Sequence, residues 1–234
     1  MLICSEPNNK YIDQPSLSRS PLSEAKAFLE QGGSLSEAAL LLEAAIQQGE
    51  LGEGGYEAWI LLGETRNMDE REELGLRALT EGVRRSEAAN ANGAGMLVCI
   101  SSGNSYQLAL MTNSFQSLAI SYTNESYDRA AYNMLLRWLR ARFPDFPIPE
   151  ETQRAVSLHS TWDSHEKITE TFLALARHQH NQGIVDPETQ IAIGVLFYTT
   201  TDYERAKDCF ESALSQRPRV SSGRHRILVI DHCD

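Results

Sequence analysis

Small and apolar residues recur at helical spacing along most of the chain. The clearest case lies near its end, where five positions follow one another at these intervals: Gly194, Phe197, Ala206, Phe210 and Ala213. The intervals predict two antiparallel helices that meet at the small residues, with the aromatic residues filling the space between them. Asp202–Tyr203 is predicted to be the turn, and Pro218 to end the second helix because proline lacks an amide hydrogen.

The same register recurs earlier in the chain. A first helix pair is predicted from Pro21, with its second helix marked by Ala38, Leu42 and Ala45. A second pair is marked by Trp59, Leu62, Gly63, Gly75, Leu79 and Gly82, and a third by Leu118, Ala119, Tyr122, Ala131, Leu135 and Trp138. An ordinary helical bundle would show apolar stripes without this repeated register, so stacked helix pairs of about 34 residues are favoured.

The predicted fold is therefore an all-α tetratricopeptide-repeat solenoid of antiparallel helix pairs, incomplete at the C-terminal end. Its parts are a disordered lead-in (1–20), a first repeat block (21–142), a Pro-containing hinge (143–163), a second repeat block (164–218) and an atypical tail (219–234). Prolines in 143–149 remove helix donors, which is why a hinge is expected there.

The stretch 98–116 interrupts the third repeat. Without it, Gly95–Leu97 would lead directly into Ser117 and the repeat would read smoothly. Two explanations stay open: translated intron, which could also account for the tail, or a genuine surface insertion of the kind that repeat arrays tolerate. The Ser, Gly and Asn content of the stretch predicts poor order under either explanation.

Charge and hydropathy narrow the choice of partners. The 234 residues carry a formal net charge of -11, and no nucleic-acid partner is expected because phosphate binding needs clustered Lys and Arg. A cationic peptide suits the chain better. The longest apolar runs, 96–100 and 227–230, fall far short of the roughly 20 residues that span a bilayer. No direct membrane insertion is therefore expected.

No reactive centre is predicted. The four cysteines have no paired short spacing, which argues against a zinc site or a disulfide framework. His178 and His180 are two residues apart and point to different sides of a helix. We therefore expect no enzyme activity, no catalytic residue, no metal and no cofactor. Residues 1–6 do not look like a secretory signal, so the cytoplasm is the expected location.

Three strings carry a resemblance to a known family. They are LAISYTNES at 118–126, GVLF at 194–197 with YERAKDCF at 203–210, and LSEAALLLEAA at 35–45. The chain resembles, in pieces from about 21 to 218, the carboxy-terminal repeat domain of the peroxisomal import receptors that read Ser-Lys-Leu type signals. The resemblance implies that the carboxy-terminal peptides of cargo proteins are partners, and that the protein cycles between the cytoplasm and the peroxisome.

The resemblance also implies a peptide-binding site. Thr123 and Asn124 would contact the incoming peptide, and Ile120 would line its last side chain. An Asn amide can donate to a terminal carboxylate and accept from a peptide N–H, which orients a ligand without carrying charge. Asp69 and Glu125 would add negative potential for a basic residue in the signal. From the chain alone, Asn124 fits a turn equally well, and a solvated face is the commoner meaning of such acidic residues.

Two other functions stay open. The family's groove is completed by later repeats, whereas this sequence leaves the pattern after Pro218, so half of the expected site is missing. A generic tetratricopeptide-repeat scaffold, or a nonfunctional product of a faulty gene model, would account for this. Peroxisomal docking partners would bind through the family's amino-terminal half, which this sequence does not represent.

Overall fold

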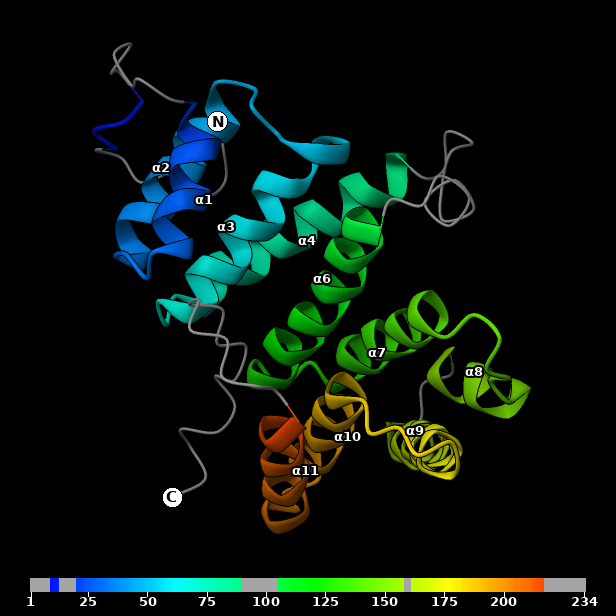
Figure 1. The fold of residues 1–234 in the computed structure, drawn as a ribbon. Helices are drawn as coiled ribbons and strands as arrows, with labels where there is room; N and C mark the ends of the chain where they lie inside the picture. The colour runs from blue at the N-terminus through cyan, green and yellow to red at the C-terminus, as the bar shows by residue number, and fades with distance from the viewer. Residues whose placement is uncertain (1–8, 13–19, 90–104, 158–160, 217–234) are drawn as a thin grey trace. The chain divides into compact units, whose positions relative to one another are not determined.

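The computed structural model describes residues 9–12, 20–89, 105–157 and 161–216, which are mostly helical (Figure 1). No strand occurs in these ranges, so the predicted all-α class is confirmed for them. The chain divides into two compact units, one running up to Ser121 and the other beginning at Tyr122. The division falls inside helix α6 (Ser105–Asn124).

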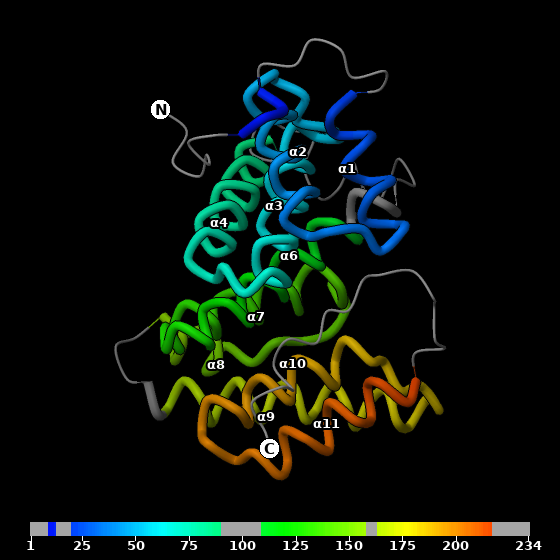
Figure 2. Tube along the Cα trace, turned by 90° about the vertical axis from the view of Figure 1, so that its left-hand side faces the viewer, coloured from blue at the N-terminus to red at the C-terminus, as the bar shows by residue number. Residues whose placement is uncertain are grey.

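The first unit is built from helix pairs. Its helices are α1 (Pro21–Glu30), α2 (Leu35–Gln47), α3 (Glu57–Met68), α4 (Glu72–Ala89) and α6 up to Ser121, with a short 3-10 turn η1 (Glu53–Gly55) before α3. Helix α1 packs on α2, α2 on α3, and α3 on α4. Both views show α1 beside α2 and α3 beside α4 (Figures 1 and 2). The first two predicted repeats are thus present as pairs.

Serines set the starts of the first two helices. The Ser20 hydroxyl accepts a hydrogen bond from the Ser23 amide, and Pro21 occupies the first helical position. The Ser34 hydroxyl accepts from the Glu37 amide at the start of α2. A side-chain oxygen at this position satisfies one of the free amide donors of the first turn, and proline there loses nothing.

Glycines let α3 and α4 approach closely. A Cβ atom on Gly63 would lie 2.5 Å from Leu79 Cγ and 2.9 Å from the Gly75 carbonyl oxygen. A Cβ atom on Gly75 would in turn lie 3.0 Å from the Gly63 carbonyl oxygen. Contacts this short leave no room for any larger residue. The small positions expected from the repeat therefore stand where the two helices touch.

The second unit continues with more helices. These are α7 (Asp128–Arg142), α8 (Glu150–Ser157), α9 (Thr161–Asn181), α10 (Pro187–Thr199) and α11 (Tyr203–Gln216). Helix α9 packs against α7, α8 and α10, and α10 packs against α11. Trp138 stacks on Phe172 with ring centroids 5.9 Å apart. A Cβ atom on Gly194 would lie 2.5 Å from Phe210 Cε1, as the predicted pairing of these positions requires.

The expectation of poor order in 98–116 is wrong for residues 105–116. They form the first part of α6 and run directly into residues 117–124. Leu110, Met111 and Phe115 are buried, and the Ser114 hydroxyl bonds to the Met111 carbonyl of its own helix. The Ser114 hydroxyl is therefore satisfied within the helix while the three apolar side chains reach the core. Residues 98–104 lie outside the described residues.

Two further boundaries differ from the predicted ones. The lead-in was expected to be disordered, but residues 9–12 form a turn against α2, and Asn9 is 6% exposed. The predicted hinge contains helix α8, since only 143–149 carries the prolines that prevent a helix. The rest of the lead-in, apart from Ser20, lies outside the described residues, as does the tail.

Candidate functional site

The last turn of α6 carries three of the five residues expected to bind a peptide. Asn124 is the final residue of the helix and is exposed, Thr123 is 7% exposed, and Ile120 is half-buried. Glu125 follows directly and is exposed. A helix end of this kind offers an amide and a carboxylate to solvent beside a partly covered aliphatic side chain.

The turn after Asn124 is fixed by backbone and ring contacts. The Ser126 amide donates to the Thr123 carbonyl at 3.0 Å, and the Tyr127 amide donates to the Tyr122 carbonyl at 2.7 Å. The rings of Tyr122 and Tyr127 meet edge to face with centroids 6.3 Å apart. Ser126 has a positive φ of 60°, which a non-glycine residue adopts only where its surroundings hold it. Two backbone hydrogen bonds and one ring contact therefore close the turn that follows Asn124.

Helix α6 is tied to α3 by two side-chain hydrogen bonds within the first unit. Asn67 Nδ2 donates to Ser121 Oγ at 2.6 Å, and Ser117 Oγ donates to Glu64 Oε1 at 3.2 Å. Ser117 and Ser121 are one turn apart on the same face of α6. The two contacts hold α6 at one position along α3.

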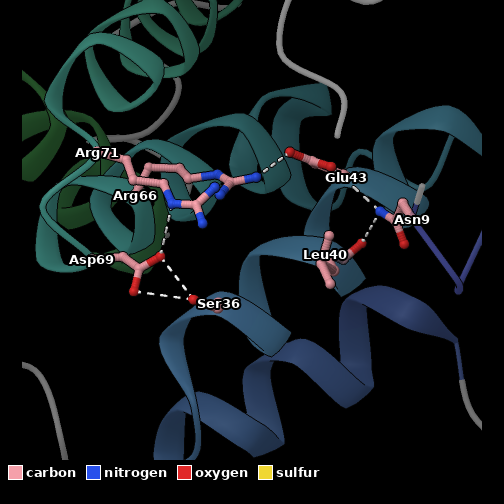
Figure 3. A network of polar contacts seen from close by, with 7 residues as sticks. All are labelled: Asn9, Ser36, Leu40, Glu43, Arg66, Asp69 and Arg71. Carbon is pink, nitrogen blue, oxygen red and sulfur yellow. Dashed lines mark hydrogen bonds and ion pairs between the residues drawn. The ribbon is translucent and has the colours of Figure 1, made fainter. Parts of the chain in front are cut away.

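Asp69 belongs to a different polar group. It follows the end of α3, and its two carboxylate oxygens lie 2.9 and 3.2 Å from Ser36 Oγ, whose single hydroxyl hydrogen they share. Arg71 Nε lies 3.4 Å from its carboxylate, and the Asp69 side chain is 21% exposed. Figure 3 shows this carboxylate between Ser36 and Arg71. Asp69 therefore forms an ion pair with an arginine that the sequence pattern did not single out.

A second part of the same network lies deeper between α2 and α3. Glu43 and Arg66 form an ion pair whose side chains are 3% and 2% exposed. Asn9 Nδ2 donates to the Leu40 carbonyl at 2.8 Å and to Glu43 at 3.3 Å (Figure 3). Sequence reasoning missed this group because Asn9 lies in the stretch expected to be disordered. The one signal was Glu43, a charged residue inside the apolar run 38–46.

The second unit contains an apolar hollow of about 710 Å³. It lies where the connection after α7 meets the end of α9 and the start of α10. Arg142 and Asp186, which form an ion pair, are among the residues that line it. The Phe146 ring lies 6.2 Å from that of His178. None of the five residues expected to bind a peptide lines this hollow.

Metal chemistry and membrane insertion find no support in the described ranges. No three His, Cys, Asp or Glu side chains gather there in a group that could hold a metal ion. No helix found there is both long and apolar enough to cross a bilayer. Cys209 is a free thiol, and burial raises its pKa to about 11, so it is mostly protonated near neutral pH.

The paired helices and the exposed polar end of α6 define a helical repeat protein with a candidate binding face. Comparison with known proteins shows which proteins this chain is similar to. A peroxisomal targeting signal receptor of Debaryomyces hansenii is 35% identical over 212 residues, or 90% of this chain. Receptors of the same name from Candida albicans and Saccharomyces cerevisiae are 33% and 32% identical, each over 90% of the chain. The chain is related to the peroxisomal targeting signal receptors.

The relationship covers part of each relative. The chain spans 31% of the Debaryomyces receptor and 30% of the Saccharomyces receptor. No family model matches the sequence. A solved structure of TPR-like repeats in a kinesin light chain of Podosopora anserina covers 88% of the chain at 17% identity, with a TM-score of 0.45. Because the relatives reported above are named as receptors, they support the prediction that this chain is not an enzyme.

Proposed function

We propose that this chain binds the carboxy-terminal peptides of proteins destined for the peroxisome, as part of a receptor for Ser-Lys-Leu type signals. The observation that carries the proposal is the match of 90% of the chain to proteins named peroxisomal targeting signal receptor. The string from Ile120 to Glu125, on which the expected site rests, lies at the exposed end of α6.

The chemistry assigned to each residue follows from its place. The Asn124 amide donates to the peptide, to its carboxylate or backbone, and accepts a peptide N–H. Ile120, one turn before Asn124 on the same helix, lines the position of the last side chain, and Thr123 contacts the peptide together with Asn124. Glu125 is exposed and supplies negative potential for the basic residue of the signal.

Asp69 has a weaker role in this proposal. Its carboxylate already accepts from Ser36 and faces Arg71, so part of its charge is neutralised within the first unit. We assign it a long-range contribution to the negative potential that attracts cationic peptides, consistent with the net charge of -11. As part of such a receptor, the protein is proposed to cycle between the cytoplasm and the peroxisome.

Peptide binding by the whole purified chain tests this function. A fluorescent peptide ending in Ser-Lys-Leu is titrated with the protein, and the same peptide with an amidated end serves as the control. We expect saturable binding that weakens about ten-fold or more on amidation, because a charge-assisted hydrogen bond contributes about 1.5–3 kcal/mol. Equal binding of both peptides, or no binding by a folded chain, would contradict the proposal.

A further inference from the structure

The apolar hollow of the second unit lies between two connections, one after α7 and one between α9 and α10. All the residues that line it belong to this unit. Its volume of about 710 Å³ falls within the range of about 300–1,000 Å³ that is typical of binding pockets. The wall is mostly apolar and includes Phe143, Phe146 and Leu175. The hollow therefore has the size and lining of a site for an apolar group.

The connection between α9 and α10 leaves two aliphatic side chains open to solvent at this hollow. The Gly183 amide donates to the His180 carbonyl, and the Ile184 amide donates to the Gln179 carbonyl, each at 2.9 Å. In helix ends of this type the residue after the glycine often packs back on the helix. Ile184 is nevertheless 52% exposed, and Val185 is 39% exposed. Covering these two side chains would stabilise a complex, since apolar surface would leave water.

One charge at the hollow has no counter-charge. Arg142 donates to both carboxylate oxygens of Asp186, at 3.1 and 3.4 Å, so these two charges balance each other. The Arg142 guanidinium also lies over the Phe143 ring, 5.6 Å from its centroid. Asp145 is exposed, and its carboxylate pairs with no residue in the ranges that the structure describes. The balance of charge at the hollow is therefore negative, by the Asp145 carboxylate.

The wall around Asp145 offers acceptors rather than donors. Pro144 and Pro147 line the hollow on either side of it and have no amide hydrogen. The Phe146 amide already donates to the Phe143 carbonyl at 3.1 Å. A ligand that brings hydrogen-bond donors and a positive charge fits this wall, whereas a carboxylate or phosphate would face Asp145 without a new partner.

We propose that the hollow binds a short basic peptide segment of a partner protein. One bulky apolar side chain of the segment covers Ile184 and Val185, and a neighbouring Lys or Arg lies beside Asp145. The net charge of -11 attracts such a segment and repels an acidic one. None of the five residues expected to bind the carboxy-terminal peptide lines the hollow, so this second site does not rest on the proposed function.

Peptide titration of the full chain, followed by fluorescence anisotropy, tests the site. The labelled probe is Gly-Lys-Phe-Lys-Gly with both ends blocked, which removes the terminal carboxylate that the end of α6 is proposed to bind. We expect saturable binding that excess unlabelled Ser-Lys-Leu peptide does not displace. Gly-Glu-Phe-Glu-Gly and Gly-Lys-Ser-Lys-Gly, blocked in the same way, should each bind at least about five-fold more weakly, because one lacks the charge and the other the apolar group.

Two variants separate the apolar and the charged contribution. Ile184→Ser should bind the Lys-Phe-Lys probe about five-fold or more weakly. Asp145→Asn should lose about two- to five-fold, with a smaller loss at high salt. Leu214→Ser and Asp163→Asn are the matched controls: Leu214 is 44% exposed, Asp163 is exposed, and neither lines the hollow. Both should stay within about two-fold of the unmodified chain.

Several outcomes would overturn this inference. They are no binding of the basic probe, equal binding of the three peptides, displacement by the Ser-Lys-Leu peptide, and an unchanged affinity of Ile184→Ser. Sedimentation checks a different occupant: a chain that dimerises by itself but is monomeric as Ile184→Ser would assign the hollow to a second copy. A Ser-Lys-Leu peptide that fails to bind contradicts the proposed function alone, because the Ile184 and Asp145 variants still decide the role of the hollow.

Discussion

Glu43 and Arg66 stand on neighbouring helices and form an ion pair that is almost completely buried, with side chains 3% and 2% exposed. Asn9 donates to the second oxygen of the same carboxylate. A buried charge costs several kcal/mol unless a partner compensates it, so the two residues are needed together. The pair fixes α2 against α3 and makes the first unit sensitive to the loss of either member.

Replacing Arg66 alone should destabilise the protein strongly. Arg66→Met leaves Glu43 buried beside an apolar side chain, and we expect the free energy of unfolding to fall by about 3–5 kcal/mol. The double variant Arg66→Met with Glu43→Leu removes both charges and should regain most of that loss. Urea unfolding followed by circular dichroism measures both changes. A double variant no more stable than Arg66→Met would show that the pair is not the source of the effect.

The turn at residues 9–12 should contribute to the stability of the first unit. Asn9→Ala removes the hydrogen bonds to Leu40 and Glu43 and should cost about 1–3 kcal/mol in thermal or urea unfolding. Lys10→Ala is the control, because its ion pair with Glu37 is exposed at 53% and 34%. Such a pair contributes about 0–1 kcal/mol. Equal losses in the two variants would argue against docking through Asn9.

Glycine positions in the second repeat should differ in their tolerance of alanine. A Cβ atom on Gly63 meets backbone atoms, the Leu79 nitrogen at 2.8 Å and the Gly75 oxygen at 2.9 Å. A Cβ atom on Gly82 would lie 2.8 Å from Ile60 Cγ1 and 3.2 Å from the Ile60 nitrogen, so its nearest backbone atom is farther away than at Gly63. Gly63→Ala is therefore expected to cost about 1–3 kcal/mol, whereas at Gly82 the better helix propensity of alanine offsets much of the strain. Unfolding midpoints in the reverse order would contradict this reading of the α3–α4 contact.

The contribution of Glu81 to the stability of the protein should depend on pH. Hydrogen bonds from Arg84 and then Arg85 lower its pKa from 4.5 to about 2, against partial burial, which raises it. A carboxyl group whose pKa is lowered in the folded state stabilises the fold at pH values above its ordinary pKa. This contribution is lost as the pH falls from about 4.5 toward 2. Glu81→Gln should thus be less stable by about 1 kcal/mol at pH 6, with the gap closing on acidification. Glu73 forms an exposed ion pair with Arg77 on the same helix, so Glu73→Gln should lose less stability than Glu81→Gln. A loss of stability in Glu81→Gln that does not change with pH would show that the lowered pKa of Glu81 is not its cause.

The sequence was sufficient for the helix pairs because their signal is local. Gly63, Gly75 and Gly194 stand where two helices meet, and each pairing of small and large residues has a fixed spacing within one repeat. The start of α6 was missed for the opposite reason. Its Ser, Thr and Asn content is typical of a loop, yet the hydroxyls of Thr112 and Ser114 bond to carbonyls of their own helix, which composition alone does not reveal.

Contacts between residues far apart in the chain were not predictable. The Asn67–Ser121 hydrogen bond joins residues 54 positions apart, and Asn9 meets Leu40 across 31 positions. Neither asparagine belongs to a motif. Their hydrogen bonds form only because the folded chain brings α6 close to α3 and the turn at 9–12 close to α2.

The central claim, that the end of α6 binds the carboxy-terminal peptide, is tested most directly by exchanging one asparagine at a time. Asn124→Ala and Asn133→Ala are titrated with the Ser-Lys-Leu peptide; Asn133 is an exposed asparagine of α7 whose amide donates to the Arg129 carbonyl of its own helix. We expect about a ten-fold or larger loss of affinity for Asn124→Ala and less than about two-fold for Asn133→Ala. Equal affinities of Asn124→Ala and the unmodified chain would place the binding face elsewhere and contradict the account.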